Sequence, residues 1–154
     1  MKNLMNHTKT LLIACVLLMA SGAYAQAPAQ DECSTQSLKG GYGFSVAGDN
    51  LGLGVKFAII GRFTADGQGR FDGVAAESVA GQMGRTTFSG AYIVNPDCTG
   101  SARFLFPNGA EANLDFVITN DGNDVFIIDT DRGTVEFGTA KKQFVRHGQG
   151  NDQP

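Results

Sequence analysis

The chain has 154 residues, with 12 Lys and Arg against 15 Asp and Glu, 21 glycines and no tryptophan. This length suits one globular domain with its own core, and the modest acidic surplus is spread along the chain. No block of basic residues follows residue 25, so nucleic acids and anionic membrane surfaces are poor partners for such a surface.

The first 25 residues have the three parts of a cleavable secretory signal. Lys2 and Lys9 make the start positive, residues 11–20 form an unbroken apolar run, and Ala23 and Ala25 are the small residues that precede a cleavage site. The apolar run is too short to span a bilayer as a helix. We therefore expect cleavage after Ala25 and export to the bacterial periplasm or beyond.

A bacterial lipobox is the alternative interpretation of the same segment. Residues 12–15 resemble one and would make Cys15 a lipidated residue. The apolar run continues past Cys15 to residue 20, however, whereas a lipobox normally closes such a run. Cys15 is better explained as a small apolar residue in a segment that is removed.

After the signal we expect a flexible segment over 26–32, a β domain over 33–145 and a disordered tail over 146–154. Cys33 and Cys98 are the two cysteines left after cleavage. In an exported protein such a pair predicts a disulfide. The bridge would close a long loop, which on the chain-entropy argument stabilises the fold by about 4 kcal/mol.

Turn residues divide the domain at regular intervals, most clearly at 66–69, 95–100, 107–109, 120–123 and 131–133, with looser turns at 49–52 and 81–84. The segments between them alternate apolar and polar residues, which is typical of half-buried strands. We predict eight strands, near 39–47, 54–65, 69–79, 85–95, 100–106, 110–119, 123–129 and 134–142. Short connections favour an antiparallel meander closed as a small all-β barrel, with a β-sandwich as the alternative.

The alternation also predicts which side chains face the core. The inward set is Val55, Phe57, Ile59 and Phe63, then Phe88, Tyr92 and Val94, then Ala102, Phe104 and Phe106, then Leu114, Phe116 and Ile118. Near the C-terminus, Val135 and Phe137 are expected to face inward and Glu136 outward. Glu77, Glu111 and Asp115 are likewise assigned to the solvated face.

Three segments resemble a group of uncharacterised secreted bacterial proteins. They are residues 38–44 (LKGGYGF), 61–69 (GRFTADGQG) and 90–100 (GAYIVNPDCTG). The organisation of that group looks like the allene oxide cyclase or lipocalin-type barrel. The resemblance covers roughly residues 33–142 and implies the barrel. No catalytic residue of the cyclases matches a position here, so it implies no activity.

Few residues offer catalytic or metal-binding chemistry. His147, within the expected tail, is the one histidine left after cleavage, which disfavours His-based triads and zinc or copper sites. Residues 120–124 gather Asn and Asp oxygens that Ca²⁺ could use, but without EF-hand spacing. Those residue types also favour tight turns. Carboxylates on the strands could supply the pair of acidic residues that a glycosidase needs, although no tryptophan is present to stack against a sugar. We expect no metal and no cofactor.

Aromatic residues are the most suggestive feature, because inward rings either fill a small barrel or line an apolar pocket in it. If a pocket exists, the expected lining is Phe57, Phe88, Tyr92, Phe104 and Phe116. Arg62 and Arg103 are the polar groups to examine at its rim, where a guanidinium could hold a carboxylate, although their parity argues against an interior position.

Two hypotheses for function follow. The first is a non-enzymatic exported barrel that binds a small apolar molecule or serves as a structural module with a protein partner. The alternative is a barrel isomerase or hydrolase acting on an apolar substrate. A titratable group inside the barrel would favour the enzyme.

Overall fold

A computed structural model describes residues 32–144 of the chain. The predicted signal, the lipidation candidate Cys15, nearly all of the flexible segment and the predicted tail lie outside these residues. The described part contains one short 3-10 helix and eight strands: η1 (Thr35–Leu38), β1 (Gly40–Asn50), β2 (Val55–Ala65), β3 (Arg70–Val79), β4 (Gln82–Val94), β5 (Thr99–Leu105), β6 (Glu111–Thr119), β7 (Asp124–Asp129) and β8 (Thr134–Lys142).

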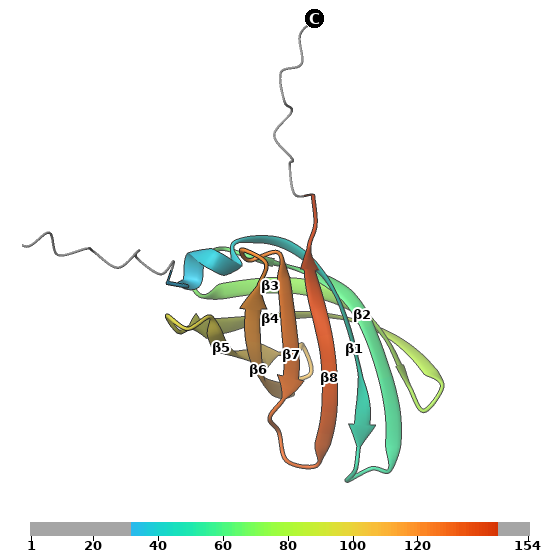
Figure 1. Ribbon diagram of the computed structural model, residues 1–154. Coiled ribbons are helices and arrows are strands. Elements are labelled where there is room, and N and C mark those ends of the chain that lie inside the picture. Colours follow the sequence, from blue (N-terminus) through green and yellow to red (C-terminus); the bar gives the residue numbers. More distant parts are fainter. Residues whose placement is uncertain (1–31, 145–154) are drawn as a thin grey trace, which may run out of the picture. The chain divides into compact units, whose positions relative to one another are not determined.

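The strands form a closed antiparallel barrel in which each pairs with its neighbour in sequence and β8 pairs back with β1 (Figure 1). The predicted all-β meander of eight strands is therefore confirmed, and the sandwich alternative is wrong. The β3–β4 turn is tighter than predicted, since Ala80 and Gly81 alone connect the strands and both have positive φ, 48° and 83°. No helix within residues 32–144 is long and apolar enough to cross a membrane.

One end of the barrel is covered by η1 and is called the closed end. Leu38 of η1 is buried there. The Tyr92 hydroxyl donates to the Thr35 carbonyl oxygen at 3.1 Å and accepts from the Gly67 N–H at 3.1 Å. The Tyr42 hydroxyl donates to the Gly122 carbonyl oxygen at 2.6 Å. These hydrogen bonds hold η1 and the turns at 66–69 and 120–123 over the closed end.

The disulfide between Cys33 and Cys98 is present in the structure. It joins the segment before η1 to the β4–β5 turn, where the Cys33 N–H also donates to the Pro96 carbonyl oxygen at 3.1 Å. The bridge therefore fixes η1 and the residues directly before it to the barrel. Such a bond is stable in an oxidising environment, which is consistent with export.

Inward glycines make room for the aromatic rings of the core. A Cβ on Gly61 would lie 2.7 Å from Cε1 of Phe44, and one on Gly48 would lie 2.9 Å from Cζ of Phe57. On β4, a Cβ on Gly90 would overlap the Phe71 ring and the Arg103 carbonyl oxygen. Rings of one strand thus lie across glycines of the next, a close approach that any side chain would prevent.

We predict that Gly90→Ala destabilises the barrel by about 1–3 kcal/mol, because the added methyl group must displace the Phe71 ring or a neighbouring strand. Guanidinium unfolding followed by far-UV circular dichroism measures the change. Gly41→Ala is the matched control, since Gly41 faces outward on β1 and a Cβ there meets nothing within 4 Å. Equal effects of the two substitutions would contradict the packing explanation.

Candidate functional site

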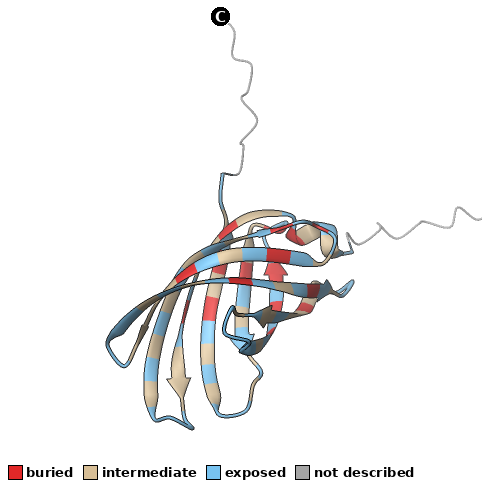
Figure 2. Ribbon diagram, turned by 180° about the vertical axis from the view of Figure 1, so that it is seen from behind, coloured by how far each residue is buried: buried red, intermediate tan, exposed pale blue. Residues whose placement is uncertain are grey.

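Side chains fill the barrel interior unequally along its axis. Inward residues near the closed end are almost fully buried, with Tyr42 0%, Tyr92 3% and Phe71 7% exposed. Toward the opposite end, called the open end, the inward residues Phe57 and Ile59 remain partly exposed. Figure 2 shows the buried residues concentrated on the side of η1. The open end carries the hairpin loops 51–54, 80–81, 106–110 and 130–133.

Aromatic packing accounts for the filled half. The Phe71 and Phe104 rings are 4.6 Å apart, the Phe88 and Phe104 rings 5.3 Å, and the stacked Tyr42 and Phe63 rings 5.1 Å between centroids. A void of about 40 Å³ remains among Leu38, Tyr92, Phe116 and their neighbours. The closed end is thus a packed plug with little free space.

A larger cavity, of about 110 Å³, lies on the open-end side of this plug. It is smaller than pockets for drug-sized ligands, which are about 300–1,000 Å³, and close in size to apolar cavities that take one benzene ring. Most of its lining is apolar. The lining residues are Phe44, Val46, Ile59, Phe63, Ala75, Glu77, Thr86, Phe88, Phe104, Phe106, Ala112, Leu114, Ile127 and Glu136.

Glu136 faces this cavity, which corrects the sequence-based assignment of an outward Glu136 between inward neighbours. On β8 the inward phase is carried by Gly138 and Ala140, which are both buried. Val135 and Phe137 point outward instead and are 60% and 63% exposed. The sequence pattern misled because the inward positions hold a carboxylate and two very small residues, whereas the outward positions are apolar.

The surroundings of Glu136 change its acidity. Burial raises the pKa of its carboxyl from the ordinary value of 4.5 to about 7, and the nearby negative charge of Asp129 adds to the effect. Asp129 is on the inward phase of β7, next to Ile127. Burial also raises the pKa of Asp129, against the lowering effect of the hydrogen bond that its Oδ1 accepts from the Asp131 N–H at 2.6 Å.

Glu77 is the second carboxylate of the lining, and its predicted outward orientation is also wrong. It continues the inward phase of Phe71 and Ala75 on β3 and lies against Gly84 of β4. Glu111 and Asp115, by contrast, are exposed on the outer face as predicted. Glu77 thus interrupts the apolar inward residues of β3 near the open end, between Ala75 and Val79.

Neither cavity carboxylate has a polar partner among residues 32–144. The three ion pairs of this part all lie on the exterior, between Lys56 and Asp49, Arg103 and Glu111, and Lys141 and Asp124. No Lys or Arg lines the cavity. The polar side of the cavity is therefore purely acidic, apart from Thr86.

The structure brings together some of the sequence-predicted pocket residues and separates others. Phe88 and Phe104 line the cavity, whereas Tyr92 and Phe116 line the smaller void of the plug. Phe57 faces inward over Gly48 near the open end. Which of these side chains contact a ligand stays a prediction.

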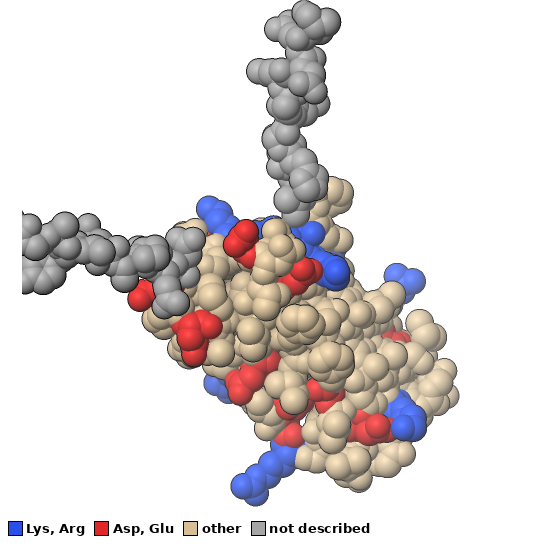
Figure 3. Space-filling model, in the orientation of Figure 1, with Lys and Arg blue, Asp and Glu red and all other residues tan. Residues whose placement is uncertain are grey.

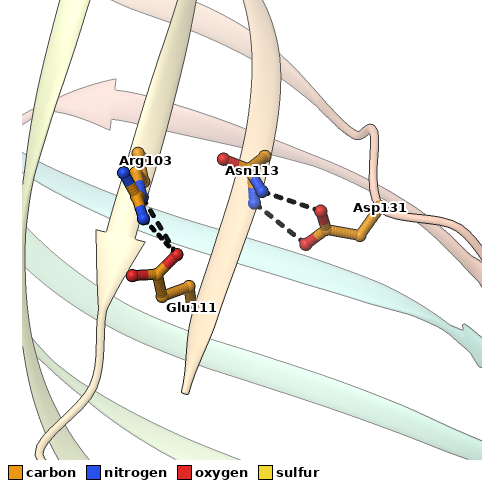
Figure 4. Close-up of polar contacts among 4 residues, drawn as sticks. All are labelled: Arg103, Glu111, Asn113 and Asp131. Atoms are coloured by element: carbon orange, nitrogen blue, oxygen red, sulfur yellow. Dashed lines mark hydrogen bonds and ion pairs between the residues drawn. The ribbon is translucent and has the colours of Figure 1, made fainter. Parts of the chain in front are cut away.

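Arg62 and Arg103 are not at the cavity. Arg62 is exposed on the outer face of β2 beside an open surface hollow. Arg103 donates through Nε to Glu111 Oε2 at 3.0 Å on the outer face (Figure 4). Nearby, Asn113 donates through its backbone N–H to Asp131 Oδ2 at 3.0 Å and through its side-chain Nδ2 to Asp131 Oδ1 at 2.8 Å. These two bonds attach the β7–β8 loop to β6.

Residues 32–144 contain no cluster of three or more His, Cys, Asp or Glu side chains able to hold a metal ion. On the face seen in Figure 3, basic and acidic side chains are scattered between wide uncharged areas. That face offers no continuous basic track of the kind that follows a nucleic acid backbone.

The sequence matches no known family model and no curated protein sequence. Solved structures with a similar fold include a redesigned β-barrel, mFAP1, bound to DFHBI (TM-score 0.53, 18% identity, 70% of this chain and 97% of that chain). Another is a de novo designed fluorescence-activating β-barrel (TM-score 0.53, 11% identity, 71% of this chain and 96% of that chain). At these identities the similarity shows the fold alone, a closed β-barrel.

We predict that protonation of Glu136 makes the stability of the barrel depend on pH. In the unfolded chain this carboxyl releases its proton near 4.5, and in the folded barrel near 7. Between these values the folded state binds more protons, so stability falls as the pH rises and then levels off above about 7. The loss is on the order of 1–2 kcal/mol, discounted because solvent still reaches the carboxylate.

Unfolding free energies of the wild type and of Glu136→Gln, measured at about pH 5 and pH 8, test this. The variant should be the more stable protein at the higher pH, and its advantage should shrink at the lower one. An advantage that does not change with pH would place Glu136 in water.

Proposed function

We propose that this protein is an exported β-barrel that binds a small apolar molecule in its cavity. The supporting observation is the unequal filling of the interior, which is packed by aromatic rings at the closed end but holds a cavity of about 110 Å³ on the open-end side. Phe44, Phe88 and Phe104 offer the ring faces and edges that favour aromatic ligands.

The dimensions of the cavity limit what can bind. A group about the size of one ring fits inside, and a longer molecule would extend through the open end toward the hairpin loops. Designed barrels of similar fold show that this architecture can hold a small molecule, since the mFAP1 structure contains DFHBI. A purely structural barrel, by comparison, needs no cavity.

Export completes the proposal. The disulfide between Cys33 and Cys98 is consistent with an oxidising compartment. We propose cleavage of the signal after Ala25 and a location in the bacterial periplasm or outside the cell. Membership of the group of secreted bacterial proteins that the sequence resembles is part of the same proposal.

Binding of a simple aromatic probe tests the proposed site. We predict that toluene binds the wild type and that Ala112→Leu weakens this binding at least about tenfold, because the larger side chain occupies the cavity. Chemical-shift changes in NMR spectra of the labelled protein measure the affinity. Ala58→Leu is the matched control, since Ala58 is exposed on the outer face of β2.

Absence of toluene binding to the wild type, or equal weakening by both substitutions, would contradict the proposal. Native mass spectrometry of the purified mature protein adds an independent readout. A small molecule that stays bound to the wild type and is absent from Ala112→Leu would identify the natural ligand by mass.

One observation favours an enzyme as the second candidate. A carboxyl with a pKa of about 7 in an apolar cavity is suited to act as a general acid or base near neutral pH. Glu136 would then move a proton to or from a bound substrate, and Glu77 would face the same cavity as a second carboxylate.

Nitrobenzisoxazole is a direct probe of this candidate, because a carboxylate base removes its ring proton and the ring opens to a coloured phenolate. We predict that, for an enzyme, turnover rises with pH through about 7 and falls at least about a hundredfold in Glu136→Gln. Asp115→Asn, on the outer face, is the control. Turnover that Glu136→Gln leaves intact would eliminate this candidate.

A further inference from the structure

The polar part of the cavity lining has only one sign of charge. Its side chains with charge are Glu77 and Glu136, and its remaining polar side chain, Thr86, donates its hydroxyl to the Thr87 carbonyl oxygen at 3.0 Å. Asp129 adds negative charge beside Glu136. A ligand that reaches the open side of the cavity therefore meets carboxylates and no basic group.

Carboxylates without partners are costly where water is limited, and proteins normally pair them with a cation or a set of donors. Among residues 32–144 neither Glu77 nor Glu136 has an ion-pair partner or a side-chain hydrogen bond. The basic side chains of β2 and β4, Lys56, Arg62 and Arg85, are exposed on the outer face. No buried side-chain oxygen of the described residues lacks a partner, so these carboxylates are open to water, and a cation that reaches them meets no competing basic group of the barrel.

We propose that the ligand of this cavity is an amphipathic amine, with an apolar group packed against Phe88 and Phe104 and a protonated nitrogen that donates to the carboxylates of Glu136 and Glu77. This inference rests on the proposed binding function and names its ligand class. Ammonium–carboxylate hydrogen bonds are short and strong, and a partly desolvated site strengthens them further.

The same arrangement selects against other apolar ligands. Fatty acids and other carboxylates would place a like charge beside Glu136, Glu77 and Asp129, which is unfavourable at short range. A neutral hydrocarbon would fill the apolar part but leave the two carboxylates unpartnered. The cavity thus discriminates by charge at its open side and by shape among the rings.

Three probes with the same ring separate these cases: benzylamine, toluene and benzoate, titrated at about pH 8, where Glu136 is ionised. In the wild type we expect benzylamine to bind at least about tenfold more tightly than toluene, and benzoate to bind more weakly than toluene. In Glu136→Gln the ratio of benzylamine to toluene affinity should fall to about a third or less of its wild-type value, and in the double variant Glu77→Gln/Glu136→Gln it should approach one.

Asp115→Asn is the control for a general loss of negative charge, because Asp115 is exposed on the outer face of β6. It should leave the affinity ratio unchanged. A second measurement needs no variant: the ratio in the wild type should decrease from about pH 8 to about pH 5.5 as Glu136 takes up a proton.

The outcomes separate the two proposals. Toluene binding without a preference for benzylamine, or a preference that Glu136→Gln leaves intact, would overturn the amine inference while the binding function stands. Failure of all three probes to bind would overturn the binding function itself. A preference that Asp115→Asn reduces as much as Glu136→Gln would assign it to surface charge and would also overturn the inference.

Discussion

Closure of the sheet through the pairing of β8 with β1 is the constraint on which the rest of the structure depends. A closed barrel has no free edge, and it directs every second side chain of every strand into one enclosed space. Those side chains must share a fixed volume. The chain meets this requirement by placing rings of one strand over glycines of the next, as Phe44 does over Gly61. The large aromatic residues and the glycines therefore belong to the same packing arrangement.

The two ends of this enclosed space have different chemistry because the inward residues change along the strands. Near η1 they are Tyr42, Phe71 and Tyr92, which fill the interior together with Leu38 of η1. The Tyr92 hydroxyl bonds to Thr35 of η1, and the Tyr42 hydroxyl bonds to Gly122 in the β6–β7 turn. Toward the hairpin loops at the other end they include Glu77, Glu136 and Asp129. The cavity lies between the packed plug and this acidic side. Binding and charge selection are thus proposed for the same few positions of the barrel.

Sequence patterning was sufficient for the architecture and for the inward faces of β2, β4, β5 and β6. The strands around Phe57, Phe88, Phe104 and Phe116 alternate bulky apolar and polar residues, so their number, spacing and inward faces could be predicted. On β8 the alternation gave the opposite phase, because hydrophobicity alone treats an exposed Phe137 as core and an inward Glu136 as surface. The true phase follows from the pairing of Glu136 with Gly48 of β1, because paired residues point to the same side of the sheet and Gly48 faces inward. The inward position of Glu136 depends on that register, which the pattern of β8 alone does not contain.

The proposed function and ligand class both depend on the position of Glu136 inside the barrel, next to an apolar cavity. Side-chain carboxyl ¹³C NMR, assigned by comparison with Glu136→Gln, measures its titration directly in the folded protein. The structure predicts a midpoint near 7, raised by burial from the ordinary pKa of 4.5. A Glu136 midpoint near 4.5 would contradict its position inside the barrel, because a carboxyl with that pKa would be as well solvated as one on the outer face.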